Sequence, residues 1–107
     1  GIEPATGLAL MQRNRPVPLE NLTTGPGKLM QALGLDKQLN GTPLSDETLA
    51  LDLTAARRPA KIMSSARIGI VNKATWTTAP LRYEVSGNPF VSKRRKRDID
   101  IEHHGWC

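Results

Sequence analysis

The chain contains the stretch Thr24-Gly25-Pro26-Gly27-Lys28-Leu29-Met30-Gln31-Ala32-Leu33. This stretch predicts a tight turn that opens directly into a helix. Pro26 suits the first helical position, where its missing N–H costs nothing. Gly25 and Gly27 have no Cβ, so the backbone of a partner can come close. Lys28 would lie in the first helical turn, where the positive end of the helix dipole disfavours a cation unless an anion binds there.

The turn therefore predicts an anion site, and phosphate is the expected anion. The amides of Gly27 and Lys28 would point outward without helical partners, and such amides are natural phosphate ligands. An ordinary helix start with a solvated lysine remains the alternative. A nucleoside-triphosphate loop is disfavoured because that motif needs Ser or Thr after the lysine, and Leu29 stands there.

Four blocks of the sequence resemble the 3-methyladenine (alkyladenine) DNA glycosylases. The first is the run from Gly25 to Gly34. The others agree with that family in order and approximate spacing: Ile2-Glu3-Pro4 with Gly7 and Met11, residues 66–70 (ARIGI), and residues 80–83 (PLRY) with residues 87–92 (GNPFVS). Because the blocks stay in register over residues 1–92, the resemblance is specific. Residues 93–107 lie outside it.

The resemblance implies a base-excision repair enzyme that hydrolyses the N-glycosidic bond of alkylated purines such as 3-methyladenine. Its partner would be double-stranded DNA with an alkylated base. Water would attack without a lysine imine, and neither a metal nor an organic cofactor is expected. The family supplies its catalytic glutamate, its stacking Tyr and His residues and its wedge residue from the amino-terminal half of the domain. A water-positioning arginine would lie just upstream of Gly1, so no catalytic residue is expected in this chain.

The resemblance also implies a set of contacts to the DNA backbone. Lys28 and the amide of Gly27 would bind one phosphate, and Arg15 and Lys37 would reach neighbouring ones. For Arg15, capping of the preceding helix is the alternative. For Lys37, the alternative is an ordinary exposed lysine.

The order of the expected elements predicts an α+β fold, because helices come first and strands follow. Apolar spacing at residues 5, 8 and 11 predicts a first helix that starts at Pro4 and ends before Pro16. The expected elements are helices over residues 4–15 and 26–33, a polar turn at residues 36–41, a loop at residues 44–47, and strands over residues 49–53, 62–70 and 81–85. The sheet would be antiparallel or mixed and curved. The resemblance implies an incomplete domain, similar to the carboxyl-terminal domain of formyltransferases.

Several side chains are expected in the interior of this fold. Leu29, Ala32 and Leu33 should be the buried face of the second helix. Arg67 lies inside an expected strand, where a buried arginine usually pairs with a carboxylate. The aromatic side chains that could stack on a base are expected in the core instead: Trp76, Tyr83 and Phe90.

The charge of the chain suits a polyanionic partner. Net charge is +5, and residues 93–97 (KRRKR) supply five positive charges. Residues 1–92 are expected to be the carboxyl-terminal part of the glycosylase domain, and residues 93–107 a basic, disordered tail that adds sequence-independent affinity. With 107 residues, 38% hydrophobic and 4% aromatic, the core is thin. The chain alone should therefore be marginally stable.

Cysteine usage and hydropathy suggest a compartment. The single cysteine, Cys107, excludes an internal disulfide, and this fits a reducing environment. No apolar run approaches the length of a membrane span, and a cytoplasmic, nucleoid-associated monomer is expected. The His103-His104-x-x-Cys107 group offers too few ligands for a structural zinc site. Two other functions stay open: a nucleic-acid-binding module without catalysis, and an enzyme of formyltransferase-like architecture that does not act on nucleic acid.

Overall fold

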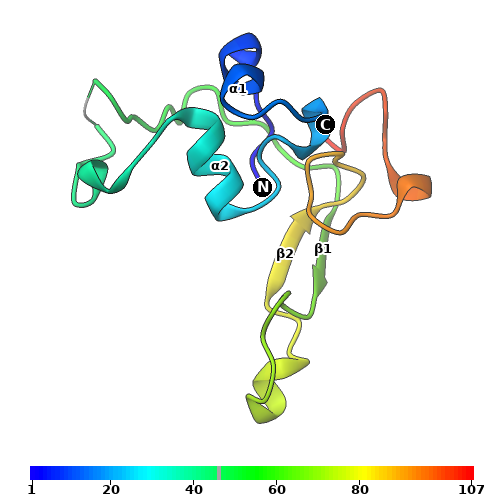
Figure 1. Cartoon of the computed structure of the whole chain (residues 1–107). Coiled ribbons are helices and arrows are strands. Elements are labelled where there is room, and N and C mark those ends of the chain that lie inside the picture. The colour runs from blue at the N-terminus through cyan, green and yellow to red at the C-terminus, as the bar shows by residue number, and fades with distance from the viewer. Residues whose placement is uncertain (46) are drawn as a thin grey trace. The chain divides into compact units, whose positions relative to one another are not determined.

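The computed structural model describes residues 1–45 and 47–107, and Figure 1 follows the chain through them. This part of the chain is a small α+β structure with two α-helices and one two-stranded antiparallel sheet. It divides into two compact units, Gly1–Ala56 and Arg57–Cys107. None of the described helices is long and apolar enough to cross a membrane.

The first unit is built on two helices, α1 (Leu8–Asn14) and α2 (Pro26–Leu33), which pack against each other. The predicted bounds of α2 are confirmed. Gly34 ends α2 in the left-handed conformation (φ 65°), and the amide of Leu35 donates to the carbonyl of Met30 at 2.9 Å. The predicted start of the first helix at Pro4 is wrong, because Gly7 takes a left-handed φ of 71° and α1 begins only after it.

The core of the first unit is small. Met11, Leu22 and Ala32 are buried, and Val17 packs against them. The predicted burial of Ala32 is confirmed, but Leu29 is only half-buried and Leu33 is 44% exposed. The physical reason is that α2, within the described residues, packs mainly on α1, so that one stripe of α2 is covered.

The connecting segments of this unit are mostly short turns. One turn of 3-10 helix spans Leu19–Asn21 and another spans Lys37–Leu39, the second within the predicted polar turn. A strand over residues 49–53 was predicted wrongly: among the described residues this segment belongs to no sheet, and its Ala50 forms an isolated bridge with Ser45. Asp46, in the predicted loop at residues 44–47, lies outside the described residues.

The second unit is organised by a hairpin of β1 (Ile62–Ser65) and β2 (Arg82–Val85), with Ile62 opposite Val85. The predicted β2 is confirmed, whereas β1 is shorter than expected. Since β2 has four residues, it offers no partner beyond Ser65, and the connecting segment projects past the strands (Figure 1).

That connecting segment contains Arg67 and Trp76, two residues that the sequence predicted to lie in the core. Arg67 is half-buried and donates from Nη2 to the carbonyl of Trp76 at 3.3 Å, so its partner is a carbonyl and not the predicted carboxylate. Trp76 is 60% exposed and Tyr83 is 69% exposed, which makes their predicted core packing wrong. Phe90 is buried, as predicted.

The last ten residues fold back onto the rest of their unit. The amide of Asp100 donates to the carbonyl of Gly87 at 2.8 Å, and the amide of Cys107 donates to the carbonyl of Arg58 at 2.9 Å. Trp106 bridges to Pro59, and the Arg57 guanidinium lies 4.5 Å from its ring centroid. The sequence suggests a disordered tail here, whereas in the structure residues 100, 106 and 107 contact residues 57–59 and 87. A domain boundary at residue 92 stays a prediction.

Candidate functional site

The turn before α2 lies at the surface. Pro26, Gly27 and Lys28 are exposed, and no side chain within residues 1–45 and 47–107 caps this end of the helix. The first helical bond runs from the amide of Leu29 to the carbonyl of Gly25, at 2.8 Å. The amides of Gly27 and Lys28 therefore precede the helical bonding pattern and are left for an outside acceptor. This arrangement can bind an anion between two amides and an ammonium group.

Gly27 is not required by the packing of its own unit. A Cβ added to Gly27 would meet nothing within 4 Å, and one added to Gly25 would meet only Cδ of Lys28, at 3.9 Å. Glycine inside a helix costs roughly 1 kcal/mol relative to alanine. Its use here leaves open space next to the free amides, where the backbone of a partner can approach.

Arg15 lies just past the end of α1 and its side chain reaches toward α2. Nη1 donates to Oε1 of Gln31 at 3.0 Å, and Nη2 donates to the carbonyl of Asn21 at 3.4 Å. Nε is buried and has no hydrogen-bond partner in the part of the chain that the structure describes. Each Nη carries a second N–H, so the half-buried guanidinium can keep these bonds and still bind an anion.

Gln31 is a residue of this site that sequence reasoning missed. Besides accepting from Arg15, its Nε2 donates to the carbonyl of Asn14 at 3.5 Å, so it links the end of α1 to α2. Gln31 follows Lys28 by three residues, and side chains at that spacing share one face of a helix. The structure therefore brings Arg15 to the face of α2 that carries Lys28. This spacing was the available signal, but it does not reveal a partner from another helix.

Lys37 is exposed in the short turn that follows α2. Lys28 lies in the first turn of that helix, and eight residues of helix extend about 12 Å. Lys37 therefore follows the carboxyl end of α2, whereas Lys28 lies near its amino end. Asp36 supports the turn by accepting from the amide of Gln38 at 2.8 Å.

The structure shows a small pocket in the second unit. A pocket of about 50 Å³, lined by Glu84, Asn88 and Arg94 among others, is far smaller than the roughly 300–1,000 Å³ of small-molecule sites. No group of three or more His, Cys, Asp or Glu side chains gathers as a metal site within residues 1–45 and 47–107. The amides, the ammonium group and the guanidinium near the start of α2 are groups that suit anions.

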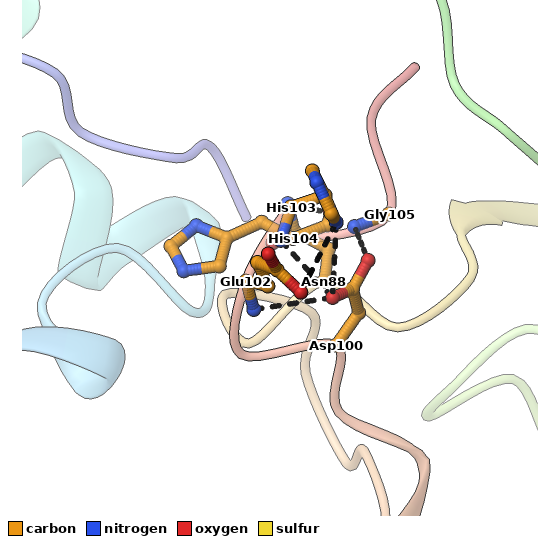
Figure 2. Close-up of polar contacts among 6 residues, drawn as sticks. All are labelled: Asn88, Asp100, Glu102, His103, His104 and Gly105. Carbon is orange, nitrogen blue, oxygen red and sulfur yellow. Dashed lines mark hydrogen bonds and ion pairs between the residues drawn. The ribbon is translucent and has the colours of Figure 1, made fainter.

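A second polar cluster lies near the carboxyl end and is drawn in Figure 2. Oδ1 of Asp100 accepts from the amides of Glu102 (3.1 Å) and His103 (3.0 Å), and Oδ2 accepts from that of Gly105 (3.1 Å). The His103 amide, followed by that of Gly105, lowers the pKa of the Asp100 carboxyl below its ordinary value of 3.8. Sequence reasoning missed this cluster, although an aspartate that accepts amides a few residues on is a common turn former.

Acid is expected to loosen this carboxyl-terminal turn. Because the pKa of Asp100 is lower in the folded chain, its contribution to stability is complete above pH 3.8 and is lost as the pH falls through the lowered value. Fluorescence of Trp106 in a Trp76→Phe background should therefore change on acidification below pH 3.8. Asp100→Asn should remove most of that change, and an equal response with and without the carboxyl would contradict this role.

Comparison with known proteins gives long matches to glycosylase sequences. A protein of Lactiplantibacillus plantarum named "Putative 3-methyladenine DNA glycosylase" is 66% identical over 106 residues, which cover 99% of this chain and 51% of that protein. Proteins of the same name from Latilactobacillus sakei and Staphylococcus haemolyticus are 51% and 46% identical, and the matches cover 98% of this chain and 50% and 52% of theirs. The chain spans about half the length of these relatives, and the similarity continues past residue 92 into the basic run.

The family comparison agrees with these relatives. The model of the family described as methylpurine-DNA glycosylase (MPG) matches residues 1–89, which include both helices and both strands. The segments quoted for the resemblance, up to Pro89, fall inside this match. This chain belongs to the methylpurine-DNA glycosylase family.

Proposed function

We propose that the protein to which this chain belongs is a base-excision repair DNA glycosylase, which hydrolyses the N-glycosidic bond of alkylated purines of the 3-methyladenine type. The observation that carries the proposal is the family match over residues 1–89. Two relatives whose matches cover 99% and 98% of this chain are named for that activity. Water is the attacking group, no lysine imine forms, and no metal or organic cofactor takes part.

In this proposal the chain supplies contacts to the backbone of double-stranded DNA. Lys28, with the amides of Gly27 and Lys28, binds one phosphate, and Arg15 and Lys37 bind neighbouring ones. The exposed turn, the absence of a side-chain cap and the space around Gly27 support this role. Contacts of this kind fix the register of the protein on the duplex and do not read its sequence.

The catalytic glutamate and the pocket for the flipped base belong, in this proposal, to the part of the domain that the chain does not span. An enzyme of this class must extrude the target nucleotide into a pocket that fits the base. The full domain would have the curved sheet of the formyltransferase carboxyl-terminal domain. Its DNA substrate places the proposed monomeric enzyme inside the cell, at the nucleoid.

A chimera tests the proposal. Residues 1–107 replace the matching stretch of the Lactiplantibacillus plantarum relative, and release of 3-methyladenine from alkylated DNA is measured for the chimera and for the chain alone. The chimera should release the base, and the chain alone should bind duplex DNA without turnover. Turnover by the chain alone would contradict the proposed place of the catalytic residue. A chimera that binds DNA without releasing base, beside an active relative, would favour a binding module.

A further inference from the structure

The basic run at residues 93–97 forms a loop in which four of the five positive side chains are exposed, whereas Arg94 is half-buried. Lys93 and Lys96 are exposed. Nε of Arg95 lies 2.5 Å from Asp98, and Nε of Arg97 lies 3.8 Å from the same carboxylate. A single aspartate thus faces two arginines, and their side chains stay 67% and 75% exposed. The loop keeps a net positive charge that its own ion pairs do not cancel.

Two hydrogen bonds join the residues before this loop, 87 and 88, to residues after it, 100 and 104. On one side, the amide of Asp100 donates to the carbonyl of Gly87 at 2.8 Å. On the other, Nδ2 of Asn88 donates to the carbonyl of His104 at 3.0 Å, and Asn88 is only 6% exposed. The contact is tight, because a Cβ on Gly87 would lie 3.0 Å from Cβ of Asp100. The segment between residues 88 and 100 is therefore a closed loop and not a free tail.

A further layer of bonds holds the closing residues in place (Figure 2). The Asp100 carboxylate accepts from the amides of residues 102, 103 and 105. Gly105 is buried, and an added Cβ would lie 2.0 Å from the carbonyl oxygen of Ser86. We call Asn88, Asp100, His104 and Gly105 the clasp. The clasp fixes the chain on both sides of the basic loop.

We propose that residues 93–97 form a second binding loop for the phosphates of double-stranded DNA, and that the clasp presents this loop in a defined path. The inference rests on the proposed function, since it takes the same polyanion as its partner. A loop closed before binding loses less conformational freedom on the DNA than a free tail would. Its lysines and arginines add phosphate contacts, and each contact releases counterions and steepens the dependence of binding on salt.

A matched pair of variants separates the clasp from simple charge. Asp100→Ala and Glu102→Ala each remove one negative charge, so charge alone would make both bind DNA more tightly. Asp100 accepts three amides, whereas the Glu102 side chain is 85% exposed and lies 4.0 Å from His103. Asp100→Ala should weaken binding of an undamaged duplex by about threefold to tenfold. Glu102→Ala should bind the same duplex as tightly as the unaltered chain or slightly more tightly. Tighter binding by both variants would overturn the clasp.

A second variant tests the loop even if Asp100→Ala unfolds the second unit. Lys93→Ala with Lys96→Ala, both at exposed positions, should reduce the slope of log affinity against log salt by about two. An unchanged slope in this variant, beside a reduced slope in Lys28→Ala, would overturn the loop and leave the proposed function intact. No binding of duplex DNA by the unaltered chain would overturn both.

Discussion

Gly105→Ala is expected to destabilise the second unit by about 2–4 kcal/mol. Gly105 is buried at φ +78°, and the new Cβ would lie 2.0 Å from the carbonyl oxygen of Ser86 and 2.9 Å from Cγ1 of Val85. That oxygen cannot move freely, because the amide of Ser86 donates to the carbonyl of Lys61 at 2.9 Å and closes the hairpin. Urea unfolding followed by tryptophan fluorescence measures the effect, since both tryptophans lie in this unit.

Gly69→Ala is the matched control for this substitution. Gly69 has a φ of +76° in the same unit, but a Cβ there would meet nothing within 4 Å. Its cost should be that of the left-handed conformation alone, roughly 1–2 kcal/mol. The difference between the two variants isolates the contact with Ser86. An equal loss of stability in both would show that residues 104–107 do not pack on the hairpin as the structure describes.

The parts of the fold that could be predicted from sequence are those set by local chemistry. Pro26 and Gly34 mark the two ends of α2, and both ends were predicted correctly because each signal acts within its own helical turn. The turn at Asp36 follows the same logic, since its side chain accepts from an amide two residues on. Such features need no knowledge of the rest of the chain.

The errors come where a distant partner decides. Leu51 and Leu53 alternate as a strand would, but they are 65% and 73% exposed because no strand among the described residues pairs with them. Residues 66–70 leave the sheet because β2 begins only at Arg82, opposite Ser65. In the second unit, residues 57–58 contact residues 106–107, and no local sequence pattern predicts these contacts.

The candidate site divides in the same way. The exposed glycine turn with Lys28 in its first helical turn was predicted from consecutive residues, and the structure describes that local geometry. The hydrogen bond from Arg15 to Gln31 joins two helices across 16 positions and was not predictable from spacing. Binding of phosphate by these groups stays a prediction.

Lys28→Glu is expected to stabilise the chain and to weaken DNA binding at the same time. A carboxylate near the free amides of α2 complements the helix dipole, which should raise the free energy of unfolding by about 0.3–1 kcal/mol. The same carboxylate would compete with a phosphate for the amides of Gly27 and Lys28 and would repel it. Binding to an undamaged duplex should therefore fall more than in Lys28→Ala, whose salt slope should drop by about one.

Lys61→Glu makes the same change of charge at another exposed lysine, which directly precedes β1 in the second unit. If the turn before α2 binds a phosphate, Lys28→Glu should weaken DNA binding well beyond Lys61→Glu, because Lys28 lies in the first turn of α2, beside the amides that would bind it, whereas Lys61 precedes a strand. Equal weakening by the two variants would mean that net charge alone governs binding, and the phosphate site would be wrong. Opposite changes of stability and affinity in Lys28→Glu would separate a local anion site from general loss of folding, because unfolding lowers both quantities together.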